Sequence, residues 1–216
     1  MVFYFKRLIL KAFVVLSPLL VLLLVSRAFS AFVIVDEPST ITKGNLGHSL
    51  IIEISYSPSY IDQWLTNSKS TNYLLMLDPD WMERSSSSMK IIKERNISTG
   101  LLITQTDEPR SLPPLLEKYK KIMGELPLWV SCTPAPCTDE QVAYLFSEKI
   151  NLIHPTITLT NETQLKKLED GAIVKIPLDD QFKLNEEQLS QLVNHSFISV
   201  EENILGYKIK TKRMPE

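Results

Sequence analysis

Short apolar runs alternate along the chain with polar stretches in which apolar residues recur at helical spacing. The apolar runs are rich in Ile, Leu and Val and predict buried strands at 49–55, 73–77, 98–104, 126–131, 151–159 and 172–178. The stretches between them predict helices at 57–68, 80–96, 111–124, 138–150, 160–171 and 185–195. Strands that alternate with helices are typical of βαβ units and a mainly parallel sheet.

The number of repeats narrows the fold class. About seven βα steps suit a (β/α) barrel-like arrangement at least as well as an open doubly wound sheet, and both are α/β folds. A chain of 216 residues with 44% hydrophobic residues can bury one sizeable core, so we expect one domain at 48–216. The polar segment 36–47 is predicted to be a connector.

The first 35 residues break this pattern with a longer apolar stretch. A basic patch precedes an apolar run at 12–25, and Ala28 and Ser30 supply the small residues of a cleavage site. Two interpretations of 1–35 stay open. An uncleaved hydrophobic helix would be a signal-anchor that tethers a single-pass protein to the cell membrane, with its domain outside the cytoplasm. A cleaved signal peptide would release a secreted protein.

Charge and cysteine content agree with an extracytoplasmic location. The net charge is −2, and no Lys/Arg-rich stripe with interleaved aromatic residues occurs, so we expect no nucleic-acid partner. Cys132 and Cys137 enclose four residues, two of them proline. Outside the cytoplasm such a pair can form a disulfide, and this is the favoured interpretation over free thiols or a metal site.

Candidate chemistry gathers where apolar runs end. Asp78 and Asp80 follow the run at 73–77, Trp81 comes next, and Asp179 follows the run at 172–178. In parallel α/β folds, functional groups lie at the carboxyl ends of the strands. The two aspartates are candidate catalytic groups, while Trp81 and Asp179 are candidate substrate contacts. The alternative interpretation is that the aspartates stabilise the start of a helix and that Trp81 packs in the core.

The order of these pieces resembles the polysaccharide deacetylase family, the NodB-homology fold. "LLMLDPDW" stands where the family has a strand ending in a T-F-D-D-G-P-type motif, followed by "SMKIIKERNIS" as a helix and "TGLLIT" as a strand. "WVSCTPAPC" stands at the place of R-P-P-x-G, and "LEDGAIVKIPL" at the strand that normally ends L-x-H. Residues 184–202 resemble the family's terminal helix and the strand after it. The resemblance covers residues 70–203.

The resemblance implies chemistry that this sequence only partly retains. Family members use a divalent metal to polarise an acetamide carbonyl and activate water. Asp78 matches the family's base, but Pro79 stands in place of the metal-binding Asp, with Asp80 as a shifted substitute. The expected H-x-x-x-H pair is absent from 105–119, and the late His is replaced by Ile176 or Pro177.

From these departures we predict a degenerate deacetylase-like domain with no metal cofactor. It would be membrane-tethered and would bind a cell-wall or surface glycan, or an envelope protein, without catalysis. The alternative is a divergent metal-dependent deacetylase that uses Asp78, Asp80 and His154.

Overall fold

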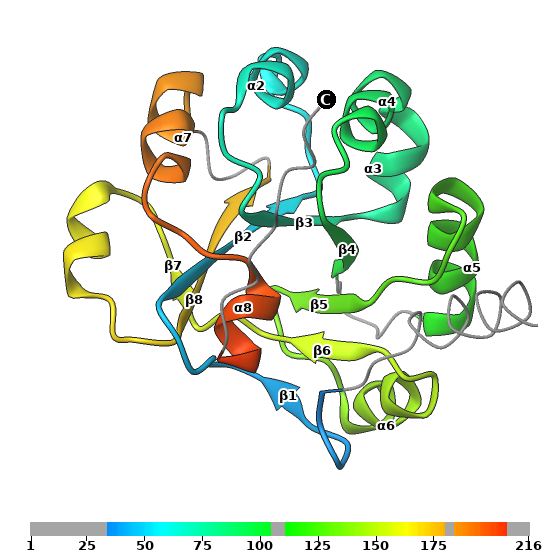
Figure 1. Cartoon of the computed structure of the whole chain (residues 1–216). Coiled ribbons are helices and arrows are strands. Elements are labelled where there is room, and N and C mark those ends of the chain that lie inside the picture. Colours follow the sequence, from blue (N-terminus) through cyan, green and yellow to red (C-terminus); the bar gives the residue numbers. More distant parts are fainter. Residues whose placement is uncertain (1–33, 105–110, 180–183, 207–216) are drawn as a thin grey trace, which may run out of the picture.

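The computed structural model describes residues 34–104, 111–179 and 184–206, which form one curved sheet surrounded by helices (Figure 1). The sheet has the strand order β1-β6-β5-β4-β3-β2-β8-β7, and the pairs between neighbouring strands are parallel. The strands are β1 Thr40–Ile41, β2 His48–Ile54, β3 Tyr73–Leu77, β4 Thr99–Thr104, β5 Trp129–Thr133, β6 Asn151–Ile153, β7 Ile157–Thr158 and β8 Ala172–Leu178. The predicted parallel, barrel-like α/β fold is therefore confirmed.

The helices lie outside this sheet, apart from the last one. They are α2 Ile61–Asn67, α3 Pro79–Arg84, α4 Ser86–Glu94, α5 Leu112–Met123, α6 Asp139–Ser147, the 3-10 helix η1 Glu162–Lys167, α7 Glu186–Val193 and α8 Val200–Leu205. The predicted N-terminal hydrophobic helix lies outside the described residues. None of the helices within the described ranges has the length and apolar character needed to cross a bilayer.

Side chains on the strands divide between two cores. The outer core lies between the sheet and the surrounding helices, and the inner core lies inside the barrel. On β2, Leu50, Ile52 and Ile54 pack against the surrounding helices, while Ile51 points to the opposite face. The inner core also holds Met76, as well as Leu74, Leu102, Trp129 and Ile173 from other strands. Strands that are buried on both faces read as continuous apolar runs. This explains why the runs that predicted the strands show no alternation with polar residues.

Helix α8 closes the amino end of the barrel, where the resemblance to the deacetylases implied a strand. That prediction is wrong. Val200 and Ile204 pack into the inner core. The Ser199 hydroxyl accepts a hydrogen bond from the Glu202 amide, and the Glu202 side chain accepts one from the Ser199 amide. This capping box starts a helix in spite of the β-branched residues around it.

Three further segments differ from the sequence-based expectations. The helix predicted at 80–96 is two helices, α3 and α4, which meet at Ser85 within the run of serines. The strand predicted at 151–159 splits at Pro155 into β6 and β7, which pair with different strands. The segment 160–171 holds the short η1 in place of an α-helix.

The segment predicted as a connector takes part in the barrel. Within 36–47, β1 pairs with β6, and one antiparallel bridge joins Lys43 to Ala172 at the start of β8. The amide of Gly44 donates to the Gly171 carbonyl at 2.8 Å. A Cβ atom on Gly44 would lie 2.1 Å from Asn203 Oδ1, so glycine allows the chain to pass close to α8 here.

Candidate functional site

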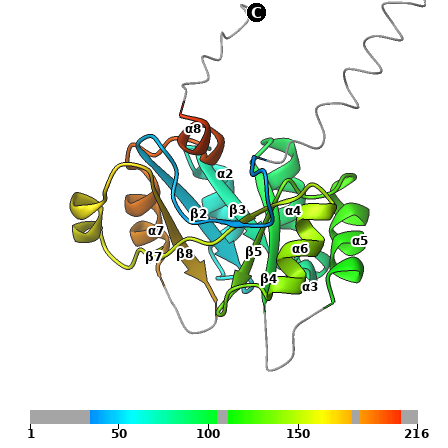
Figure 2. The ribbon, with the colours of Figure 1, turned by 90° about the horizontal axis from the view of Figure 1, so that it is seen from below.

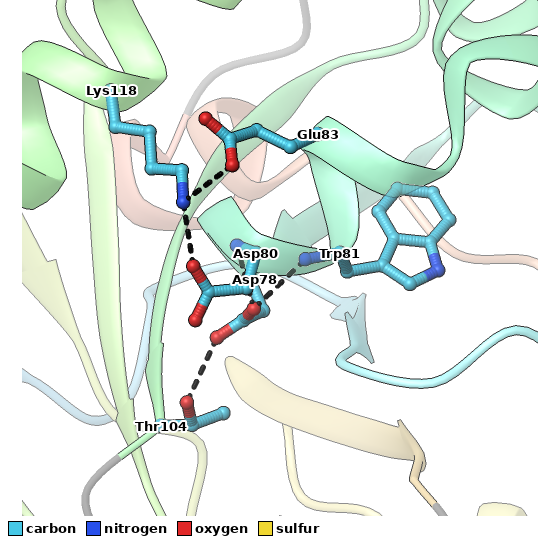
Figure 3. Close-up of polar contacts among 6 residues, drawn as sticks. All are labelled: Asp78, Asp80, Trp81, Glu83, Thr104 and Lys118. Carbon is cyan, nitrogen blue, oxygen red and sulfur yellow. Dashed lines mark hydrogen bonds and ion pairs between the residues drawn. The ribbon is translucent and has the colours of Figure 1, made fainter.

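Asp78 lies at the carboxyl end of β3 and caps the N-terminus of α3. Its Oδ1 accepts hydrogen bonds from the amides of Asp80 at 2.9 Å and Trp81 at 3.0 Å. Its Oδ2 accepts one at 2.8 Å from the hydroxyl of Thr104, the last residue of β4 (Figure 3). Only 4% of the residue is exposed. Pro79 at the first helical position reinforces the cap, because its missing N–H needs no partner there.

Asp80, the second residue of α3, pairs with a lysine of α5. Lys118 Nζ lies 2.6 Å from Asp80 Oδ1 and 2.8 Å from Glu83 Oε2, so one ammonium group joins two carboxylates (Figure 3). The hydrogen bonds to Asp80 and then to Glu83 raise the pKa of Lys118 above its ordinary value. Lys118 therefore remains charged at neutral pH and pairs with the Asp80 carboxylate.

Trp81 is not available to a sugar in this structure, so its predicted role as a substrate contact is corrected. The residue is 0% exposed, and it packs from α3 into the outer core. Its indole Nε1 donates to the Ser57 hydroxyl at 2.6 Å, on the side away from Thr104 (Figure 3). Stacking requires an open ring face, which a fully buried indole lacks.

Asp179 lies directly after β8 and is half-buried. It therefore shares the carboxyl edge of the sheet with Asp78, as the parallel arrangement requires. Its role in ligand contact stays a prediction. His154 follows β6, which β5 and β4 separate from β3 in the sheet. The sheet thus does not place His154 next to the two candidate catalytic aspartates.

A buried ion pair that the sequence analysis did not single out lies inside the barrel. Lys175 Nζ on β8 is 3.0 and 3.2 Å from the two carboxylate oxygens of Glu53 on β2. Ser131 donates to Glu53 at 3.4 Å, and Lys175 donates to the Thr133 hydroxyl at 3.4 Å, so both residues contact β5. The sequence signal was one charge of opposite sign within each of two apolar runs, "LIIEI" and "AIVKI".

The residues at this edge do not fit a divalent cation. Asp78 accepts three hydrogen bonds, and lysines pair with both Asp80 and Glu53. Within the part of the chain that the structure describes, no group of three or more His, Cys, Asp or Glu residues is placed to hold a metal. Since metal sites need three or four ligands at short range, no step through a metal follows from this geometry.

The structure joins Cys132 of β5 to Cys137 in a disulfide with a Cα–Cα distance of 5.3 Å. The bond closes the loop that leads from the carboxyl end of β5 into α6. Thr138 then caps α6 through a capping box with Gln141. The loop at the place of the family's R-P-P-x-G motif is therefore held by a covalent link and a helix cap.

Solved structures with the same fold include a pseudoenzyme and enzymes of one family. BA3943, a CE4 family pseudoenzyme from Bacillus anthracis, matches with a TM-score of 0.63 and 15% identity, over 77% of this chain and 69% of that chain. Bacillus subtilis PdaA, a family 4 carbohydrate esterase, matches with a TM-score of 0.60 and 9% identity, over 78% and 86% of the two chains.

A third match is Bc1960, a peptidoglycan N-acetylglucosamine deacetylase, with a TM-score of 0.60 and 10% identity over 77% of this chain and 92% of that one. No family model matches the sequence, and no curated protein matches it. The chain therefore has the fold of the family 4 carbohydrate esterases, and the resemblance to polysaccharide deacetylases that its motifs indicated is confirmed at the level of the fold.

Proposed function

We propose that this protein is a membrane-tethered, extracytoplasmic domain with the deacetylase fold that binds a glycan without hydrolysing it. A cell-wall glycan strand is the ligand class, because one protein with this fold, Bc1960, is a peptidoglycan N-acetylglucosamine deacetylase. The tether is the apolar segment within residues 1–35, and the disulfide between Cys132 and Cys137 suits an oxidising location.

The observation that carries the loss of catalysis is the pairing of the acidic side chains. Metal-dependent amide hydrolysis needs carboxylate and imidazole lone pairs that face a cation and a water. Here lysine ammonium groups pair with the carboxylates of Asp80 and Glu53, and Asp78 caps the start of α3. An ammonium group beside Asp80 or Glu53 disfavours the binding of a second cation there, and three hydrogen bonds already engage Asp78.

Glycan binding requires the polar edge but no metal. Hydroxyl and carboxylate groups that follow parallel strands can form hydrogen bonds with sugar hydroxyls, and Asp179 is placed at this edge. Since Trp81 is buried, we expect hydrogen bonds and no stacking on its indole to dominate recognition.

Calorimetric titration of the full chain in detergent micelles with Zn²⁺, together with an assay for acetate release from peptidoglycan, tests the proposal. We expect no zinc binding at high micromolar concentration, no acetate release, and retention of the protein on insoluble peptidoglycan. Tight zinc binding that is lost when Asp78→Asn and Asp80→Asn are combined would contradict the loss of catalysis and would favour the divergent deacetylase. Failure to bind peptidoglycan would contradict the proposed ligand.

A further inference from the structure

The two ends of the described chain lie on one face of the barrel. Ile34 lies beside Asn151, the first residue of β6, and Gly206 follows α8, so both are at the amino ends of the strands (Figure 2). The carboxyl edge with Asp78 and Asp179 is at the opposite end of the molecule. Any surface that the termini contact therefore leaves the candidate site unobstructed.

Only a short segment, 26–33, separates the apolar run at 12–25 from the first described residue of the domain, Ile34. The sequence from Ala31 to Val35 reads "AFVIV", and Ile34 and Val35 already pack against the inner core. The amide of Ile34 donates to Asn151 Oδ1 at 2.8 Å, and Asn151 is fully buried. The domain consequently begins less than ten residues after the apolar run.

Asn151 also connects the start of the domain at Ile34 to a pair of exposed leucines. The backbone amide of Asn151 donates to the Leu128 carbonyl at 3.0 Å, and its side-chain amide donates to the same oxygen at 3.4 Å. Leu126 is 39% exposed and Leu128 is 37% exposed. Large apolar side chains on the surface acquire meaning when they cluster beside another apolar element.

The leucines form one wall of a groove of about 770 Å³ between the ends of α4 and α5. Met123 and Ile97 continue the apolar wall, and the exposed Lys93 and Lys120 line the same groove beside one acidic residue, Glu125. Leucines beside lysines are the combination that binds the interface of an anionic bilayer.

From this arrangement we infer that the amino-end face of the barrel, centred on Leu126 and Leu128, docks onto the lipid surface of the membrane. The inference rests on the proposed tether. Because the anchor and the patch are joined through Asn151, docking is intramolecular, and weak contacts suffice to hold the face against the lipid. The carboxyl edge then points away from the bilayer, toward a glycan layer.

Depth-dependent quenching in proteoliposomes tests this orientation. The full chain is reconstituted in vesicles of phosphatidylcholine and phosphatidylglycerol, with an environment-sensitive fluorophore on Leu126→Cys while the native disulfide stays oxidised. The matched control is Tyr56→Cys, because Tyr56 is 47% exposed and follows β2 at the opposite end. Lipids with a spin label near the headgroup are expected to quench the probe at 126 severalfold more than the probe at 56.

Flotation of the vesicles separates the two proposals. If the protein floats and both probes are quenched equally, or neither is, the orientation is overturned and the tether stands. If the probe at 126 is shielded from aqueous iodide but not quenched by lipid, another protein surface covers the patch and the lipid inference is wrong. If the protein does not float, the proposed tether fails and the inference fails with it.

Discussion

The two ends of the barrel are stabilised by different kinds of contact. At the amino end, α8 places Val200 and Ile204 in the inner core, and hydrogen bonds without an ion pair hold the helix to the strands, among them those from Asn203 to Ser49 and from Trp129 to Glu201. At the carboxyl end, charged side chains meet inside and above the barrel, in the pairs Glu53–Lys175 and Asp80–Lys118. The amino end resembles an ordinary protein core, whereas the carboxyl end retains the polar residue types of a site.

The contrast has an energetic meaning. A buried ion pair is weak evidence for stability, since the desolvation of both charges offsets much of their attraction. Apolar contacts and satisfied uncharged hydrogen bonds carry no comparable penalty. We therefore expect the amino end to stabilise the fold and the carboxyl end to keep charges that stability alone does not require.

The largest expected effect comes from breaking the inner ion pair. Lys175→Met leaves the Glu53 carboxylate buried without its cation, and should lower the free energy of unfolding by about 3–5 kcal/mol in denaturant titrations. The double variant Glu53→Leu with Lys175→Met should recover most of this loss. Lys43→Met, which removes the exposed partner of Glu169, is the control and should change stability little. A double variant as unstable as the single one would contradict the expectation that the desolvation cost of the pair offsets most of its attraction.

A somewhat smaller effect is expected at the amino end from Asn203→Ala. Asn203 is fully buried, and its side chain donates to the Ser49 hydroxyl at 2.8 Å and the Ala172 carbonyl at 3.2 Å. Loss of these donors should cost about 2–3 kcal/mol, measured by chemical unfolding. Asn67→Ala, at an exposed position at the end of α2, is the matched control. An unchanged midpoint for Asn203→Ala would mean that α8 does not hold the amino end.

Asp78→Ala separates a structural cap from a retained catalytic group. Loss of the cap on α3 should destabilise the protein by about 1 kcal/mol, while Asp78→Asn, which keeps an acceptor, should cost less. Thermal unfolding of the two variants shows which of them is the less stable. If Asp78→Ala is more stable than the natural protein, the carboxylate lowers the stability of the fold, as residues of functional sites often do. That result would indicate that Asp78 has a functional role.

The smallest effect concerns Lys118 and appears only in alkali. Its pKa is raised in the folded state by Asp80 and Glu83, so its contribution is fully present below the ordinary value of 10.5 and is lost as pH rises through the folded pKa. The stability difference between the natural protein and Lys118→Met should therefore shrink above that pH. Burial also raises the pKa of Tyr119 to about 12, but both proteins share this residue, so it cancels. A difference that stays constant to high pH would exclude the ion pairs as its source.

Sequence patterns predicted the frame of this molecule well because the frame depends on local properties. Buried strands such as 73–77 must be apolar on both sides, and Gly124 ends α5 in a left-handed conformation that glycine adopts without strain. The same logic placed Asp78 at a strand end. These features follow from a few consecutive residues and need no distant partner.

The sequence by itself determined the order of strands and helices, and the place of Asp78 and Asp179 at one edge of a parallel sheet. Only the tertiary structure decided which charges meet. Glu53 and Lys175 are 122 residues apart, and their pairing depends on β2 lying beside β8 in the sheet. It also decided that α8 fills the barrel, because the space available to that helix is formed by strands distributed over the whole chain.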